Sequence, residues 1–450
     1  MPPKFGTSGL RGLAVDLTPD LVAAHVAAFA AVCPMGRGLY VARDLRPSSP
    51  GIADAVIAAG RAAGLAVTDC GPVPTPALAL AAMGAGAAAV MVTGSHIPAD
   101  RNGLKFYTPA GEITKAHEVA ILTALDTPAE SVQPGPPPAL NDWAGAAYVT
   151  RYVAAFGPQA LSGMTVGVYS HSTVGRDLLI DVLTELGAGV VELGRSENFV
   201  PVDTEAVDAA TRAQLRAWAA EQNLTAIVSM DGDGDRPLLT DARGEVIPGD
   251  VLGQITGGYL GAQIAVTPVS SNTGAEAVFP QVRRTRIGSP YVIAEMDSAG
   301  GQVVGYEANG GFLLGFAAKG LAPLMTRDSV LPIVATLICA QGRGVAATVG
   351  AEPARFTASD RLQDVPTAAS QALISRLETD SAALQDFLTG ISGQMAGIDK
   401  TDGLRMTLMD GRIVHLRPSG NAPECRFYAE ADSAGAAQQT LAAGLTALRA

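Results

Sequence analysis

Short apolar runs alternate with a longer, Ala-rich stretch near the start of the chain. Residues 38–43 and 64–69 have the length and composition of strands, and residues 49–63 between them predict a helix. Strand, helix and strand in this order form a β-α-β unit. The beginning of the chain therefore predicts an α/β fold.

The same order of elements recurs twice downstream. Residues 164–194 contain two apolar runs separated by a helical stretch. A looser third copy predicts a strand over residues 263–268, a helix from about Gly274 and a strand over residues 285–288. Three such units in series indicate an internal repeat.

The last hundred residues have a different pattern. A helix is expected around residues 366–389, and Asp-Gly at residues 410–411 predicts a hairpin turn between two strands. Residues 425–431 alternate like a strand, and a helix is expected from near Asp432. This region predicts a small α+β domain.

Breaks in these patterns divide the chain. At 450 residues it exceeds what one hydrophobic core usually serves. The proline-rich stretch 134–140 is a stiff connector, and further breaks lie near residues 244–249 and 351–356. We expect three related α/β domains and a smaller C-terminal α+β domain, with boundaries at 1–138, 139–246, 247–354 and 355–450.

Composition narrows the class of protein. Hydrophobic residues make up 48% of the chain and charged residues 16%, which indicates a globular protein. The net charge of -12 and the pI of about 4.9 argue against nucleic acid or an anionic membrane as a partner. An anionic substrate would therefore need a local basic pocket.

The cysteines and the apolar stretches indicate where the protein resides. The four cysteines lie far apart without a C-x-x-C pair, so neither a zinc site nor a dense disulfide framework is expected. Residues 70–99 carry no charge, but their prolines and the polar residues 93–96 exclude a continuous membrane-spanning helix. The N-terminus lacks the apolar run of a signal peptide. We expect a soluble, cytoplasmic protein.

The strongest chemical motif is Asp231-Gly-Asp233-Gly-Asp235-Arg236, which follows an apolar strand-like run. Carboxylates at alternate positions, separated by glycines, can converge on one hard cation, and Mg²⁺ is the natural choice. An EF-hand calcium loop is excluded, because Arg236 and Ala242 stand where a glycine and an acidic residue are needed. A solvated acidic turn is the alternative reading.

A second motif is the apolar run that ends in Thr-Gly-Ser95-His96. A strand that ends in such a loop exposes the serine hydroxyl at the edge of a sheet, where ligands bind in α/β folds. His96, Arg101 and Lys105 supply nearby cations or proton carriers. The motif is not a hydrolase elbow, since Ile97 stands where a glycine is required, and an ordinary turn is the alternative reading.

Three weaker motifs complete the set. The segment that begins at Arg417 combines a forked donor, a hydroxyl, an amide and a glycine, which suits a phosphate dianion. Glu307 and Asn309 lie in a Gly-rich turn and could bind sugar hydroxyls, and Arg11 near the N-terminus could meet an anion. Each of these three has an ordinary loop or terminus as its alternative reading.

Taken together and in this order, the five motifs resemble the α-D-phosphohexomutase family from residue 5 to about residue 431. The resemblance implies four domains around a central cleft. It implies that Ser95 carries a phosphate and that Asp231, Asp233 and Asp235 hold Mg²⁺, with the serine phosphate as a further ligand. The other implied positions are Arg11, Lys105 and Arg236 around the transferring phosphoryl group, Glu307 and Asn309 for the sugar, and Arg417, Ser419, Gly420 and Asn421 for the second phosphate.

The implied activity is an intramolecular phosphotransferase that interconverts hexose 6-phosphate and hexose 1-phosphate through a hexose 1,6-bisphosphate. Mannose phosphates are favoured as substrates, while glucose and glucosamine phosphates stay open, as does the choice of Lys105 or His96 as proton carrier. Gly311 stands where some members of the family have a histidine. A serine-dependent metal phosphatase and a non-catalytic sugar-phosphate binder are the alternatives from other classes, and the oligomeric state is not indicated.

Overall fold

The computed structural model describes residues 2–6, 8–126, 133–418 and 424–449. Within this part of the chain, four sheets follow one another in sequence order. The first three mix parallel and antiparallel strands, and the fourth is antiparallel throughout. The predicted fold class, three α/β units followed by a smaller α+β unit, is confirmed.

The first unit is built on an eight-stranded sheet with the order β1-β2-β6-β5-β3-β4-β8 and with β7 paired to β6. Its strands are β1 (Lys4–Phe5), β2 (Leu10–Leu13), β3 (Leu39–Arg43), β4 (Val67–Asp69), β5 (Ala88–Val92), β6 (Arg101–Thr108), β7 (Gly111–Glu112) and β8 (Ala139–Leu140). Its helices are η1 (Ala14–Asp16), α1 (Pro19–Val32), α2 (Ser49–Ala62), α3 (Thr75–Ala85) and α4 (Lys115–Ala124). The predicted β-α-β unit is β3, α2 and β4, and its two strands are parallel.

Both faces of this sheet are covered by helices, and β5 shows how. Val90 and Val92 point into the core formed with α1, α2 and α4. Ala89 and Met91 point to the opposite face, where the Ala-rich helix α3 packs. A strand buried on both sides is apolar at every position, which explains its uninterrupted run and fixes its carboxyl end beside the serine loop.

The second and third units have sheets of order β10-β9-β11-β12 and β14-β13-β15-β16-β17. Their strands are β9 (Thr165–Tyr169), β10 (Gly189–Leu193), β11 (Ala226–Met230), β12 (Pro237–Leu239), β13 (Ile264–Pro268), β14 (Gln281–Thr285), β15 (Val303–Tyr306), β16 (Phe312–Leu314) and β17 (Leu324–Asp328). Their helices are α5 (Ala144–Phe156), α6 (Arg176–Glu185), α7 (Ala209–Glu221), α8 (Gly249–Leu260), α9 (Ala275–Val278), α10 (Ser289–Ala299), α11 (Val330–Cys339) and α12 (Val345–Val349).

The third unit departs from the predicted pattern. The helix expected from Gly274 is a single turn, α9, and the strand expected at residues 285–288 is β14, which ends at Thr285. Gly288 and the Ser289-Pro290 pair instead begin the longer helix α10. A proline in the first turn of a helix is favourable, and this start signal was not recognised in the sequence.

The second and third units share one continuous hydrophobic core. Side chains from α5 and β9 in the second unit pack in the same cluster as side chains from α8, β15 and α11 in the third. The hydroxyls of Tyr148 and Tyr152 on α5 donate hydrogen bonds to Asp328, which precedes α11. These two units therefore form one body, to which α3 of the first unit is joined through Ala77.

The last unit has the sheet order β18-β22-β21-β20-β19. Its elements are β18 (Phe356–Leu362), α13 (Thr367–Thr379), α14 (Ser381–Gly390), β19 (Met395–Asp399), β20 (Leu404–Leu408), β21 (Ile413–Pro418), β22 (Cys425–Ala431) and α15 (Ala434–Arg449). The expected hairpin at residues 410–411 is confirmed between β20 and β21. The helix expected over 366–389 is broken at Asp380, whose carboxylate accepts hydrogen bonds from the Ala382 and Ala383 N–H groups and caps α14.

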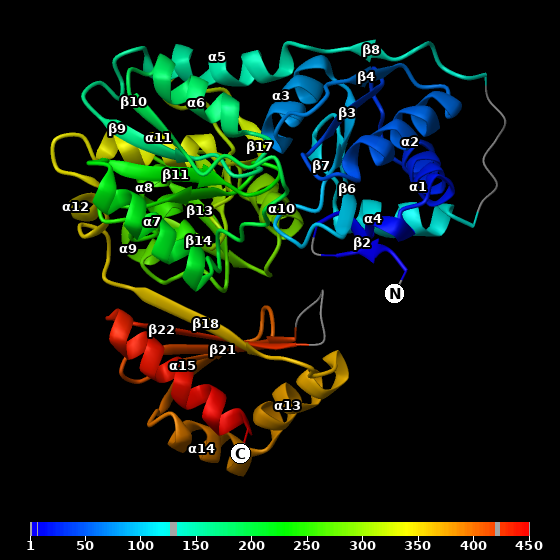
Figure 1. Ribbon diagram of the computed structural model, residues 1–450. Helices are drawn as coiled ribbons and strands as arrows, with labels where there is room; N and C mark the ends of the chain where they lie inside the picture. The colour runs from blue at the N-terminus through cyan, green and yellow to red at the C-terminus, as the bar shows by residue number, and fades with distance from the viewer. Residues whose placement is uncertain (1, 7, 127–132, 419–423, 450) are drawn as a thin grey trace.

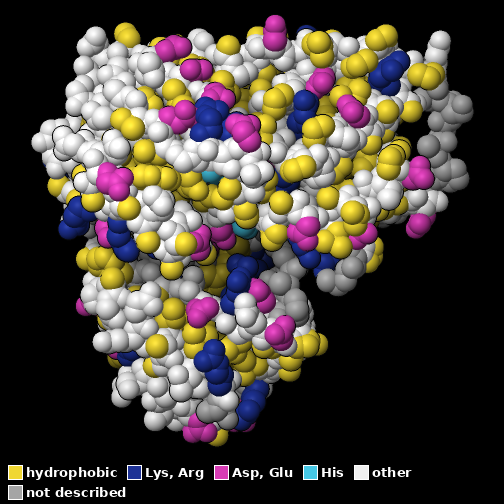
Figure 2. All heavy atoms as spheres, in the orientation of Figure 1, with side chains coloured by type: hydrophobic (Ala, Val, Ile, Leu, Met, Phe, Trp, Pro, Cys, Tyr) yellow, Lys and Arg dark blue, Asp and Glu magenta, His cyan; other side chains and the backbone are white. Residues whose placement is uncertain are grey.

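The first three units lie side by side, and the last unit lies below them in the view of Figure 1. Figure 2 shows the surface hollowed between the two parts, with Lys and Arg side chains in the hollow. The contacts across this junction include polar ones: Glu430 accepts from the Thr273 N–H, and Asp402 accepts from the Ile287 N–H. No helix in the described part of the chain is both long and apolar enough to cross a membrane.

Candidate active site

Ser95 lies in the loop directly after β5. Its backbone has a φ of 54°, in the left-handed region that is costly for a residue with a side chain. The Ser95 N–H donates to Thr93 Oγ1 at 2.7 Å, and Thr93 donates to Asp44 at 2.8 Å. The buried Arg46 guanidinium donates to the carbonyl of Ser95 at 2.8 Å and to that of Ile97 at 2.6 Å. These contacts hold the backbone of the serine loop in place.

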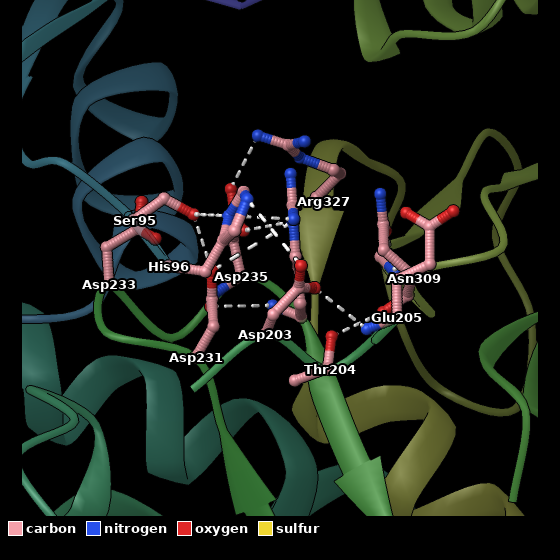
Figure 3. Close-up of polar contacts among 12 residues, drawn as sticks. Ser95, His96, Asp203, Thr204, Glu205, Asp231, Asp233, Asp235, Asn309 and Arg327 are labelled. Carbon is pink, nitrogen blue, oxygen red and sulfur yellow. Dashed lines mark hydrogen bonds and ion pairs between the residues drawn. The ribbon is translucent and has the colours of Figure 1, made fainter. Parts of the chain in front are cut away.

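The acidic loop after β11 meets this serine. Asp231, Asp233 and Asp235 are fully buried, and one oxygen from each lies within 4.8 Å of the others. Ser95 Oγ donates to Asp231 Oδ2 at 2.6 Å (Figure 3). A Cβ at Gly232 would lie 2.5 Å from the Ser95 carbonyl oxygen, so the close approach of the two loops requires glycine there.

Hydroxyl groups from three other segments donate hydrogen bonds to the acidic loop. Thr75, at the start of α3, donates to Asp233 Oδ2 at 2.7 Å. Thr173 donates to the Asp231 carbonyl at 2.6 Å, and Ser329 donates to the Gly234 carbonyl at 2.7 Å. All three of the α/β units therefore hold this one loop.

The acidic loop fits a divalent cation. Asp233 Oδ1 and Asp235 Oδ1 are buried without a hydrogen-bond partner, and carboxylate oxygens are the ligands that Mg²⁺ prefers. Burial and repulsion from its two neighbours raise the pKa of Asp231 above its usual value. Burial opposes ionisation of Asp233 as well, but Lys105 holds the pKa of Asp233 below its usual value. Such concentrated negative charge favours a cation among the three carboxylates.

Basic side chains gather around these carboxylates. Lys105 Nζ lies 2.5 Å from Asp233 Oδ2 and 2.6 Å from Asp235 Oδ2. Arg236 donates to His96 Nδ1 at 3.0 Å, and burial together with the Arg236 charge holds the pKa of His96 well below its usual value. Burial and the neighbouring arginines lower the pKa of Arg11 to about 10, so it stays charged at neutral pH. The site thus combines a hydroxyl, an acidic cluster and fixed cations.

The sugar-binding motif lies in the turn between β15 and β16, beside the acidic loop. Glu307 is buried, and Arg327 donates to its carboxylate at 3.4 Å. Asn309 Oδ1 accepts from the Gly311 N–H at 3.0 Å and so stabilises its own turn.

A loop of the second unit also faces the site, although no sequence motif indicated it. Thr204 donates to the Asn309 carbonyl at 2.9 Å, and Asp203 lies 4.0 Å from His96 Nε2 (Figure 3). Glu205 follows in the same loop, and its side chain is exposed. The loop adds two carboxylates near the predicted sugar-binding residues.

The predicted phosphate loop belongs to the last unit. Arg417 is near the end of β21, with its Nε 3.5 Å from Asp402 Oδ2. Ser419, Gly420 and Asn421 lie outside the described residues. Of the predicted positions, the structure brings together Ser95, His96, Lys105, Arg11, the three aspartates, Arg236, Glu307 and Asn309, whereas Arg417 stands on the other side of the junction between the two parts.

Models of the four domains of the phosphoglucomutase/phosphomannomutase family match the chain one after another. They cover residues 2–131 (domain I), 146–244 (domain II), 248–356 (domain III) and 356–445 (C-terminal domain). Together they cover most of the chain, so the family predicted from the five motifs is confirmed.

Relatives that match over nearly their whole length support the same family. The chain is 47% identical to a phosphomannomutase of Sinorhizobium fredii, over 100% of this chain and 99% of the relative, and 43% identical to one of Salmonella muenchen, over 96% and 92%. A solved putative phosphomannomutase from Thermus thermophilus has the same fold, with a TM-score of 0.76, 23% identity and 100% of both chains covered. The chain belongs to the phosphoglucomutase/phosphomannomutase family, as its relatives, its fold and its serine and aspartate loops together establish.

Proposed function

We propose that this protein is a phosphomannomutase, which interconverts mannose 6-phosphate and mannose 1-phosphate through a phosphorylated Ser95 and a hexose 1,6-bisphosphate. The observation that carries the proposal is the 2.6 Å contact between Ser95 Oγ and the buried aspartate cluster. The choice of mannose is supported by the two relatives with 47% and 43% identity, both named phosphomannomutase.

The metal would be held by Asp231, Asp233 and Asp235, with an oxygen of the Ser95 phosphate as a further ligand, and Mg²⁺ is the cation proposed. When bound, it supplies positive charge that stabilises the transferring phosphoryl group. The protein contributes a nucleophile already placed by the Arg46 and Thr93 contacts, so little reorganisation is needed at the moment of transfer.

The cations around Ser95 have distinct roles in this proposal. Lys105, Arg11 and Arg236 face the aspartate cluster and would bind the oxygens of the moving phosphoryl group. The Nδ1 atom of His96 already accepts a hydrogen bond from Arg236. Lys105 is engaged as well, by Asp233 and Asp235, so the group that exchanges a proton with the sugar hydroxyl would be either Lys105 or the Nε2 atom of His96.

Substrate would be held between the two parts of the molecule. Glu307 and Asn309 would bind sugar hydroxyls, and Arg417 with Ser419, Gly420 and Asn421 would bind the phosphate that is not being transferred. Because this second group belongs to the last unit, substrate binding would draw that unit toward the site and keep water from the phosphoserine.

The test is a coupled isomerisation assay on the 1-phosphates of mannose, glucose and glucosamine, each with and without a hexose 1,6-bisphosphate. We expect the highest kcat/KM on mannose 1-phosphate, activation by the bisphosphate, and no turnover by Ser95→Ala. Equal rates on all three sugars would refute mannose specificity. Steady release of inorganic phosphate without a bisphosphate requirement would instead indicate a phosphatase, and affinity without turnover a binding protein.

A further inference from the structure

Arg327 connects the aspartate cluster to the sugar-binding turn, and no sequence motif indicated it. It lies in β17 with only 3% of its surface exposed. Its guanidinium reaches Asp235 Oδ2 at 2.8 Å and Glu307 Oε2 at 3.4 Å. Figure 3 shows the side chain extended across the site toward Asp235. One buried cation thus contacts both a proposed metal ligand and a proposed sugar ligand.

The guanidinium has hydrogen-bonding capacity that these contacts do not use. Nε is buried without a hydrogen-bond partner, and Nη2 makes no aligned hydrogen bond although it lies 2.8 Å from Asp235. A guanidinium carries five N–H donors in a planar fork that matches phosphate and carboxylate oxygens. The remaining donors suit an anionic or hydroxyl-rich ligand in the adjacent site.

The side chain of Arg327 also explains the glycine at position 311. A Cβ built on Gly311 would lie 2.7 Å from Cδ, 2.9 Å from Cγ and 3.2 Å from Cβ of Arg327. The contacts involve the stem of the arginine near its backbone, which cannot swing away as a flexible end can. Position 311 therefore requires glycine, because the Arg327 side chain fills the space that a Cβ would occupy.

We propose that Arg327 is a positioning residue of the phosphoryl-transfer reaction, which orients Glu307 toward the sugar and places a permanent cation next to Asp235. This inference rests on the proposed mutase function. A guanidinium does not give up its proton at working pH, so Arg327 contributes charge and hydrogen bonds and does not replace a proton carrier. Its contribution differs in kind from that of a histidine at position 311.

The first test compares Arg327→Met and Arg327→Lys with a surface control, Arg243→Met, whose side chain is 78% exposed. The readouts are Tm, KM, and the single-turnover rate of phosphoryl transfer from the phosphorylated enzyme to mannose 6-phosphate. We expect Arg327→Met to slow transfer about 100-fold and raise KM several-fold, Arg327→Lys to lose about tenfold, and the control to match the wild type. Wild-type transfer and KM in Arg327→Met would overturn the proposal.

Chemical rescue separates this role from a structural one. Adding guanidinium to Arg327→Ala should restore part of the transfer rate, because the small cation can occupy the vacated position. A lowered Tm with no rescue by guanidinium and no benefit from the Lys variant would show that Arg327 only supports the fold, and would overturn the proposal. If the wild-type enzyme itself fails to isomerise any hexose phosphate, the proposed function fails instead.

A double-mutant cycle tests the link to Gly311. Gly311→Ala should slow transfer at least tenfold in the wild type, because its methyl group displaces the Arg327 stem. In the Arg327→Ala background, which removes Cγ and Cδ and so the two closest contacts, the same change should have little effect. An equal loss of transfer rate in both backgrounds would show that Arg327 is not the reason why position 311 requires glycine.

Discussion

Replacing Arg46 with Met should destabilise the first domain and disable the serine loop together. Arg46 is 1% exposed, and its Nε lies 3.1 Å from Asp44 Oδ2. The rest of the guanidinium donates to four carbonyls of the serine loop and its continuation, those of Ser95, Ile97, Pro98 and Arg101. Met keeps much of the side-chain volume and removes the charge and all of these donors.

The size of the effect follows from burial. Removing one partner of a buried ion pair costs about 3–5 kcal/mol, because the other charge is left uncompensated. Burial already raises the pKa of Asp44 and the Arg46 charge counteracts this rise, so removing Arg46 should raise the pKa of Asp44 further. For a domain of this size, the loss corresponds to a fall of roughly 10 °C in Tm.

The test is calorimetry of three variants beside the wild type. Arg46→Met should lower Tm by the amount above, whereas Asp44→Asn with Arg46→Met should recover part of it, because no buried charge then remains. The control is Arg216→Met, which breaks an ion pair to Glu245 at 2.7 Å whose side chains are 51% and 47% exposed. Such exposed pairs contribute about 0–1 kcal/mol. A Tm for Arg46→Met within the range of the Arg216 control would refute the reasoning.

Three further predictions concern the metal, the pH dependence and the core. Chelation by EDTA should abolish turnover and Mg²⁺ should restore it, while Asp233→Asn should weaken Mg²⁺ binding measured by calorimetric titration at least tenfold, and unchanged binding would contradict the assigned site. His171 and His415 are buried with pKa values lowered to about 4, chiefly by burial. Below pH 6.5 the unfolded chain binds protons that the folded protein excludes, so stability should fall between pH 6.5 and 4, and His415→Gln should flatten that slope in urea titrations at a series of pH values. Tyr152→Phe removes a donor to the buried Asp328 and should cost about 1–3 kcal/mol in the same urea assay, so a loss below 0.5 kcal/mol would contradict this assignment.

Elements with strong local patterns were predictable from the sequence. The apolar runs and the Ala-rich helix of the first unit specify β3, α2 and β4 within a few residues, because both period and length are distinctive there. The break at Asp380 and the single turn at α9 were missed, since capping and packing decide them over one turn of helix. The domain boundaries at 138, 246 and 354 stay predictions.

The candidate site was predictable only where its residues are neighbours in the chain. The serine and aspartate loops each carry several functional groups within a few positions, so both could be recognised. Arg46 and Arg327 lie in separate segments, and the groups that tie them to the site, the Ser95 carbonyl and Asp235, lie far from them in the sequence. The available signal was weak: a charged pair, Arg327 with Asp328, inside an otherwise apolar segment.

The continuous core of the second and third units has a mechanical consequence. A shared apolar interior resists shear, so those two units should move as one rigid body, and we expect opening at the junction with the final unit. That junction includes hydrogen bonds such as those of Glu430 and Asp402, which water can replace at little free-energy cost. The unliganded enzyme should therefore exchange readily between open and closed arrangements, and the charge of a bound sugar phosphate should favour the closed one.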